Sequence, residues 1–218
     1  MGKLAASILS ADLAHLADQV KLVQAHADLI HIDIMDAHFV PPLTIGPAVV
    51  ASLRPHTART LHVHLQVETP DGLFDDLAEA GADVVSFHVE AVADPGPVIR
   101  KARGTGMRVG IALSPETPAE AVLANLDEVD DVIVLAVHPG WAGQPFRPEA
   151  LPKIRAIRTE IDRRGLPVEV HVDGGVSLAT APACVEAGAM VLVPASAIFG
   201  APDPAAAARE LKRVAEAA

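Results

Sequence analysis

Imidazole and carboxylate side chains recur at alternating positions in three apolar segments of the chain. Residues 29–35 read LIHIDIM, residues 61–67 read LHVHLQV and residues 168–174 read VEVHVDG. Side chains alternate along a strand, so the polar residues share one face and the aliphatic residues the other. These residue types suit a metal centre or acid–base chemistry, and we expect all of them to meet in one small volume. They are His31, Asp33, His62, His64, Gln66, His171 and Asp173.

A bound cation would explain why imidazoles and carboxylates gather on the inward faces of three predicted strands. A lone buried imidazole or carboxylate is usually satisfied by a neighbour, but carboxylates from several strands would repel one another and be costly to remove from water. A divalent ion offsets both effects. Two imidazole nitrogens with two carboxylate oxygens suit Zn²⁺, Fe²⁺, Mn²⁺ or Co²⁺ better than Ca²⁺ or Mg²⁺. The sequence therefore predicts one divalent metal ion as cofactor.

These segments belong to a series of eight strand-like runs, at residues 4–9, 29–35, 61–67, 83–89, 107–113, 131–137, 168–174 and 190–196. Segments with helical periodicity lie between the runs. Apolar residues share one helical face in residues 12–27 (Leu13, Leu16, Val20, Val23) and in residues 149–164 (Leu151, Ile154, Ile157, Ile161).

The connections between helices and strands repeat as well. Residues 79–85, 104–110 and 186–192 each place a glycine at a helix end, two residues before a strand, where a left-handed conformation closes the helix. Eight such units predict an α/β protein with a single (β/α)8 TIM barrel as one domain over residues 1–218. An open doubly wound sheet is disfavoured because no GxGxxG motif follows the first run.

Three loops rich in small residues follow the last three runs. They read HPGWAGQPF at residues 138–146, DGGV at 173–176 and PASAIFG at 194–200, which could begin a short helix. Small residues let backbone N–H groups approach a phosphate, and the loops after strands seven and eight are the usual phosphate site of this barrel. Turn chemistry explains any one of these loops, but we favour an anion site for all three together.

Composition excludes other classes of function. The chain has 218 residues, 50% of them hydrophobic and 3% aromatic, with a net charge of −11. This acidity, without a basic cluster, excludes a nucleic-acid partner, and anion binding would depend on local backbone donors. Without a long apolar run or a signal-peptide pattern, we expect no membrane partner and a cytoplasmic location. The single cysteine, Cys184, is expected to pack in the core.

Five ordered motifs resemble those of the ribulose-phosphate 3-epimerase family: SILSADL (7–13), HIDIMDAHFVPPLTIGP (31–47), VHLQVETP (63–70), HPGWAGQPF (138–146) and VDGGV (172–176). The resemblance covers nearly the whole chain, from Ser7 to Gly200. It implies a metal-dependent barrel enzyme that interconverts D-ribulose 5-phosphate and D-xylulose 5-phosphate, assembled as a dimer or hexamer. It places the metal ligands on His31, Asp33, His64 and Asp173.

The resemblance also implies roles in the reaction. Asp33 and Asp173 would be the catalytic carboxylates, since inverting C3 requires a base on each face of the carbon. The metal ion would stabilise the cis-enediolate as a Lewis acid. Met35 would either line the site beside this intermediate or pack in the core. The implied substrate-binding residues are Ser7, Met35, His64, Gly140, Trp141, Ala142, Gly143, Gly174, Gly175, Ala195 and Ser196.

Departures from the family pattern leave the substrate open. Ala37 replaces a common Gly and Gln66 a common Met, and His62, His138, Trp141, Ala142 and Ala195 also differ. The alternative substrate is D-allulose 6-phosphate, because residues 26–36 (HADLIHIDIMD) and 140–146 (GWAGQPF) also resemble that branch. An alternative of another class is a non-catalytic sugar-phosphate-binding protein, disfavoured by the retained carboxylates.

A lysine-dependent decarboxylase or aldolase is disfavoured because the five lysines lie outside the carboxyl ends of the predicted strands. The lysines are Lys3, Lys21, Lys101, Lys153 and Lys212.

The turn after residue 35 contains two further polar residues, Asp36 and His38. They are expected to shape the turn and not to bind metal.

Overall fold

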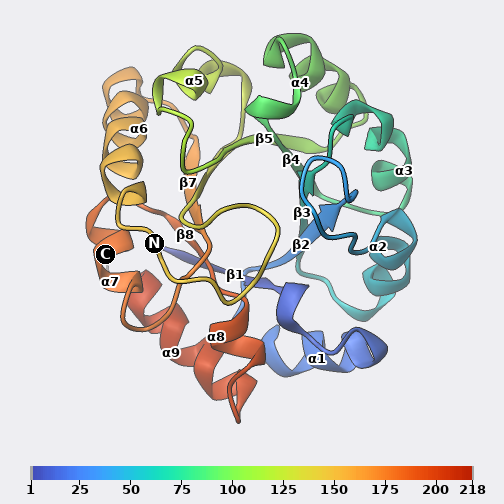
Figure 1. Cartoon of the computed structure of the whole chain (residues 1–218). Helices are drawn as coiled ribbons and strands as arrows, with labels where there is room; N and C mark the ends of the chain where they lie inside the picture. The colour runs from blue at the N-terminus through green and yellow to red at the C-terminus, as the bar shows by residue number, and fades with distance from the viewer. Residues whose placement is uncertain (1, 218) are drawn as a thin grey trace.

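The computed structural model describes residues 2–217 and contains a closed barrel of eight parallel strands surrounded by helices (Figure 1). Neighbouring strands pair in chain order, and β8 closes the barrel against β1. The predicted TIM barrel is therefore confirmed. The strands are β1 (Lys3–Ser7), β2 (Leu29–Met35), β3 (Thr60–Gln66), β4 (Val84–His88), β5 (Arg108–Leu113), β6 (Asp131–Leu135), β7 (Glu169–Asp173) and β8 (Val191–Val193).

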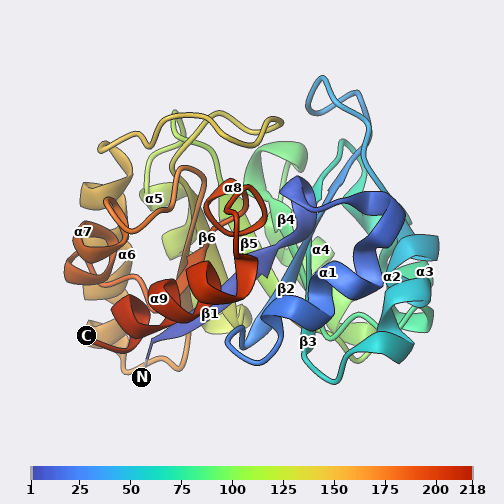
Figure 2. The same cartoon turned by 90° about the horizontal axis from the view of Figure 1, so that it is seen from below.

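Helices cover the outside of the barrel, as the two views show (Figures 1 and 2). They are α1 (Leu16–Val23), α2 (Pro47–Leu53), α3 (Phe74–Glu79), α4 (Pro95–Gly104), α5 (Glu120–Leu123), α6 (Ala150–Arg164), α7 (Ala181–Glu186), α8 (Ser196–Phe199) and α9 (Pro204–Glu216). The eighth strand is shorter than predicted because α8 begins at Ser196, which confirms the expected short helix. Within residues 2–217, no helix is long and apolar enough to cross a membrane.

The predicted helical faces are mostly buried; Leu151 is partly buried and Leu13 is exposed. Val20 and Val23 of α1 and Ile154 and Ile157 of α6 have no exposed surface. The prediction for Leu13 is wrong, because this side chain is 56% exposed. Leu13 lies in a 3-10 turn (Leu13–His15) before α1, where the Asp12 carboxylate accepts a hydrogen bond from the amide of Ala14. This local cap starts a turn, so the α-helix begins only at Leu16.

The αβ connections follow the glycine pattern of the sequence. Gly81, Gly106 and Gly188 have φ angles of 87°, 89° and 103°, which side chains other than glycine rarely adopt. Each lies directly between a helix and the following strand. The loops therefore remain short and hold every strand close to the helix before it.

Aliphatic and polar residues separate across the barrel wall. Ile30, Ile32 and Ile34 of β2 belong to the large apolar cluster between strands and helices. The alternate residues of β2 point to the barrel axis, where imidazole rings from several strands succeed one another. Ring centroids lie 5.0 Å apart for His171–His62, 5.0 Å for His62–His31, 5.4 Å for His31–His64 and 5.1 Å for His64–His88. The polar faces predicted from alternation thus form the interior.

Candidate active site

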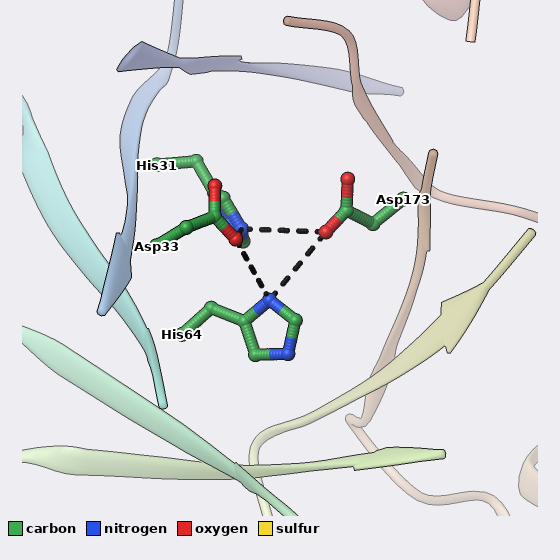
Figure 3. Close-up of side chains that lie close together, drawn as sticks. All are labelled: His31, Asp33, His64 and Asp173. Atoms are coloured by element: carbon green, nitrogen blue, oxygen red, sulfur yellow. Dashed lines mark hydrogen bonds and ion pairs between the residues drawn. The ribbon is translucent and has the colours of Figure 1, made fainter. Parts of the chain in front are cut away.

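Two imidazoles and two carboxylates converge near the carboxyl ends of β2, β3 and β7 (Figure 3). His31 Nε2 lies 3.5 Å from Asp33 Oδ1 and 3.6 Å from Asp173 Oδ2. His64 Nδ1 lies 3.1 Å and 3.4 Å from the same two oxygens. One ligand atom from each residue lies within 4.8 Å of all the others. The four residues form a compact set of nitrogen and oxygen donors.

These donors fit a divalent transition-metal ion. Atoms held about 2.0–2.2 Å from one ion lie roughly 3–3.6 Å apart, which is the spacing of most pairs in this cluster. Both ring nitrogens of His31 are buried without a hydrogen-bond partner. Unpartnered buried polar atoms are costly, and coordination of an ion would satisfy one of them. The cluster therefore fits the predicted class of cofactor.

The imidazoles of the cluster favour the ionised form of both carboxylates. Although burial favours the neutral acid, His31 and His64 keep the pKa of Asp33 well below its ordinary value. The same imidazoles lower the pKa of Asp173 against the opposing effects of burial and the Asp33 charge. Burial opposes protonation of His31, but the charge of Asp33 and the close approach of both carboxylates to Nε2, at 3.5 and 3.6 Å, raise its pKa to about 10. Ionised carboxylates can act as bases or as metal ligands.

Neighbouring side chains fix Asp33. Its Oδ2 accepts a hydrogen bond from Ser7 Oγ at 2.8 Å, and its Oδ1 accepts one from Gln66 Nε2 at 3.0 Å. The register explains this convergence, because Ser7 pairs with His31 across β1 and β2, and Asp33 pairs with His64 across β2 and β3. Asp33 is therefore oriented by residues from β1 and β3, the two strands that flank its own.

A further pair of residues orients His64 and was not selected from the sequence. His64 Nε2 lies 3.0 Å from His88 Nε2, and His88 Nδ1 lies 2.9 Å from Glu90 Oε2. This chain of contacts leaves His64 Nδ1 directed at the two carboxylates. The available signal was the polar alternation in residues 86–90, which read SFHVE at the end of the fourth strand-like run.

The predicted single cluster is wrong for two residues. His62 and His171 do not join His31 and His64 but lie with Asp131 in a second group. Residues two positions apart on a strand differ by about 6.6 Å in height, although they share a face. Alternation identifies the inward face correctly, but position along the strand determines the depth at which each side chain enters the barrel.

The predicted substrate-binding residues surround one pocket above the cluster, except His64. This side chain is fully buried and lies beneath the pocket. Met35 lines the pocket and is almost fully buried, so it fits both of its predicted roles. The predicted residues that line the pocket are Ser7, Asp33, Met35, Gly140, Trp141, Ala142, Gly143, Asp173, Gly174, Gly175, Ala195 and Ser196, and Gln66 joins them.

Loops at the mouth offer free backbone donors. Gly174 and Gly175 have φ angles of 97° and 65°, and a Cβ on Gly175 would overlap the backbone of Phe146. Within residues 2–217, the amides of Gly174, Gly175 and Ser196 donate no hydrogen bond. Successive amides of this kind form anion-binding concavities. The mouth can therefore bind an anion without a lysine or arginine.

The loop between β6 and α6 covers this mouth. Figure 1 shows it in yellow across the open end of the barrel, and Figure 2 places it at the same end as α8. The side chain of Trp141, on this loop, is 61% exposed. The cavity beneath it has a volume of about 40 Å³, room for roughly three water molecules.

The turn after β2 is built as predicted. Asp36 carboxylate oxygens accept hydrogen bonds from the amides of His38, Phe39 and Glu68 at 2.8, 2.9 and 2.8 Å. Asp36 and His38 thus shape the turn and lie outside the metal-type cluster. Ala37, between them, has a φ of 61°, the left-handed region that favours glycine.

Lys153 and Cys184 have structural roles, the first in holding a loop and the second in packing the core. Lys153 Nζ donates hydrogen bonds to the carbonyls of Ser114, Pro115 and Thr117 in the loop after β5. Cys184 in α7 is buried, and burial raises the pKa of its thiol to about 12. Its predicted packing role is confirmed.

The fold and the site together define a class of protein: a TIM-barrel enzyme with ionised carboxylates and imidazoles beneath an amide-lined mouth. Comparison with known proteins identifies the family. Residues 3–199 match the model of the "Ribulose-phosphate 3 epimerase family". The chain belongs to the ribulose-phosphate 3-epimerase family, as its motifs predicted, and is an isomerase.

Named relatives span almost the whole chain. The ribulose-phosphate 3-epimerase of Bacillus subtilis is 42% identical over 97% of this chain and 99% of its own length. That of Mycobacterium bovis is 45% identical over 99% of this chain and 93% of its own length.

Solved structures show the same fold at lower identity. A 3-hexulose-6-phosphate synthase has a TM-score of 0.71 at 24% identity, covering 97% of this chain and 99% of its own. KGPDC from Streptococcus mutans has a TM-score of 0.74 at 18% identity, covering 100% of this chain and 98% of its own.

Proposed function

We propose that the protein inverts C3 of D-ribulose 5-phosphate to give D-xylulose 5-phosphate, with Asp33 and Asp173 as the two bases. The observation that carries this proposal is the convergence of both carboxylates on His64 Nδ1 from separate strands. The curated relatives are named for this reaction. Geometry and family membership therefore favour the same chemistry.

The reaction needs a proton to leave one face of C3 and another to arrive on the opposite face. One carboxylate removes the C3 proton, and the electron pair of the broken C–H bond forms the C2–C3 double bond of an enediolate. The second carboxyl group, in its protonated form, then donates a proton to the other face of C3. Asp33 and Asp173 exchange these roles when the reaction reverses. Ser7 and Gln66 hold Asp33 by hydrogen bonds throughout.

His31, Asp33, His64 and Asp173 would hold a divalent metal ion, for which Zn²⁺, Fe²⁺, Mn²⁺ and Co²⁺ are the candidates. Bound there, the ion supplies a Lewis acid that stabilises the negative charge of the enediolate. The unpartnered nitrogens of His31 support this assignment. His88 and Glu90 orient His64, as partners of metal-binding imidazoles commonly do.

The small-residue loops would bind the phosphate group of the substrate. The amides of Gly174, Gly175 and Ser196 are the proposed donors, and Ala195 leaves room for the anion. Gly140, Trp141, Ala142 and Gly143 would close over the sugar once it is bound. Met35 and Ser7 would line the wall beside the reacting carbons. These assignments rest on the pocket that the residues share.

The alternative substrate is D-allulose 6-phosphate, and the alternative class is a sugar-phosphate-binding protein without turnover. Gln66 and Trp141 line the pocket where the two sugars would differ in fit. The ionised carboxylates disfavour a silent binding protein, since binding alone does not require them. A cytoplasmic location and a homo-oligomer, either dimer or hexamer, remain predictions.

Parallel steady-state kinetics on the two ketose phosphates test this function. We expect kcat/KM for D-ribulose 5-phosphate to exceed that for D-allulose 6-phosphate by at least tenfold. The opposite ratio would assign the hexulose substrate. Tight binding of either sugar without turnover in the metal-loaded protein would overturn the enzymatic proposal.

A further inference from the structure

A second group of metal-type ligands lies deeper in the barrel, toward the amino-terminal ends of the strands. It consists of His62 from β3, Asp131 from β6 and His171 from β7. One ligand atom from each residue lies within 4.8 Å of the other two. All three residues are at least 97% buried. The group shares no residue with the candidate active site.

Several nitrogen atoms in this group have no hydrogen-bond partner. Both ring nitrogens of His171 and Nδ1 of His62 are buried and unpartnered within the described part of the chain. Ser86 Oγ donates to Asp131 Oδ1 at 2.9 Å and contacts His62 Nε2 at 2.8 Å. This link satisfies one nitrogen of His62 and leaves His171 with none. Buried imidazoles without partners are costly, which points to a missing ligand.

The chain makes room for this group. Gly110 of β5 lies where a Cβ would overlap both Asp131 and Ser86. Asp131 Oδ1 lies 3.7 Å from His62 Nε2, close to the spacing of two atoms bound to one ion. No side chain on β5 intervenes at this point. A small adjustment of rotamers would bring the three donors around a common centre.

An open cavity connects the group to solvent. Its volume is about 120 Å³, and its lining includes His62, Asp131, His171, Glu169 and Arg108. Glu169 Oε2 lies 3.8 Å from His171 Nε2. The Glu169 carboxylate therefore adds an oxygen donor on the cavity wall beside the triad.

We propose that His62, Asp131 and His171 bind a second divalent transition-metal ion, of the class of Zn²⁺ or Co²⁺. Two imidazoles and one carboxylate form a donor set that these ions prefer to Mg²⁺ or Ca²⁺. The cavity leaves space for water as an additional ligand. Because the ion would join β3, β6 and β7 far from the mouth, its role is to tie the base of the barrel together.

Metal stoichiometry tests the proposal without reference to activity. The full-length protein is stripped with a chelator, loaded with Zn²⁺ or Co²⁺ and washed, and metal per chain is measured by mass spectrometry. We expect two equivalents in the wild type and one in His171→Gln. The surface variant His56→Gln is the matched control and should retain two. Wild type and His171→Gln with equal metal content would overturn the proposal.

Two further measurements keep the result interpretable. His64→Gln removes a ligand of the first cluster only, so it should lose one equivalent, and a double variant with His171→Gln should bind none. If His64→Gln loses metal but His171→Gln does not, the result would support the candidate active site and refute the second site. If His171→Gln does not fold, Co²⁺ titration of the stripped wild type decides: visible absorption should saturate at two equivalents, and saturation at one would refute the site.

Discussion

Asp33 and Asp173 approach the same nitrogen of His64, at 3.1 and 3.4 Å, from strands that β1 and β8 separate in the barrel wall. An open sheet would hold the ends of β2 and β7 far apart. Barrel closure is therefore what places two carboxylates on either side of one small volume. This relationship underlies the two-base proposal.

Replacing either carboxylate should stop turnover. Asp33→Asn and Asp173→Asn preserve shape but remove the base, and general acid–base catalysis typically contributes about 10²–10⁴-fold to the rate. We expect kcat to fall by at least about 10²-fold in each variant. Steady-state kinetics with circular dichroism measure this, and Asp75→Asn on the exposed face of α3 is the control. Near-normal activity in either variant contradicts the assignment.

Gln66 should tune the basicity of Asp33. Its Nε2 donates a hydrogen bond to Asp33 Oδ1, and a hydrogen bond to a carboxylate lowers its pKa. Gln66→Met removes the donor at similar volume, so the pKa of Asp33 should rise. The base is then protonated at higher pH, and the acidic limb of the pH profile of kcat/KM should move to higher pH. An unmoved limb in the pH–rate profile would show that this contact does not act on the base.

Ala37→Gly should stabilise the protein. Left-handed backbone costs a residue with a side chain about 1–2 kcal/mol, while glycine adds about 0.5–1 kcal/mol of lost chain entropy. With a φ of 61° at Ala37, we expect a net gain of about 0.5–1 kcal/mol in the free energy of unfolding. Urea titration measures it. Ala156→Gly, on the exposed face of α6, should instead lose about 1 kcal/mol. Equal losses in both variants would contradict strain at Ala37.

Glu90 should contribute to acid stability. Although burial opposes it, hydrogen bonds from His88 and Thr117 lower the pKa of Glu90 from 4.5 to about 2. A carboxyl whose pKa is lower in the folded state stabilises the fold above its unfolded pKa, and this contribution is lost as pH falls through the folded value. Wild type should therefore lose more stability than Glu90→Gln between pH 4.5 and 2. The exposed-residue control Glu79→Gln should follow wild type in chemical denaturation across this range.

Parallel pH curves for wild type and Glu90→Gln would contradict the role of this carboxylate. In that case the contacts of Glu90 with His88 and Thr117 would contribute nothing that depends on ionisation.

Most of the barrel could be predicted from the sequence, because strand alternation and glycine-closed helices repeat along the chain. Alternation alone identified His31, Asp33, His64 and Asp173 as inward residues. It could not separate His62 and His171 from that set, because alternation shows which face of a strand a side chain is on but not how deep in the barrel it lies. His31 and His62 are register partners across β2 and β3, so the direction in which each ring reaches also decides which group it joins: His31 Nε2 approaches Asp33 and Asp173.

Contacts between side chains were less accessible to sequence reasoning. The hydrogen bond from Gln66 to Asp33 and the link from His64 through His88 to Glu90 depend on rotamers and on neighbouring strands. Leu13 was predicted on the buried face of the helix, but a local cap at Asp12 starts a 3-10 turn there instead. Short-range hydrogen bonds therefore decided the ends of elements, and tertiary register decided the site.

The most direct test of the two-base mechanism is deuterium incorporation at C3. The metal-loaded protein is incubated with D-ribulose 5-phosphate in D₂O, and both sugars are examined by NMR and mass spectrometry. We predict deuterium at C3 of the D-xylulose 5-phosphate formed, with both product and label lost in Asp33→Asn and Asp173→Asn. Sugar that binds to the wild type but acquires no deuterium at C3 would contradict the proposed function.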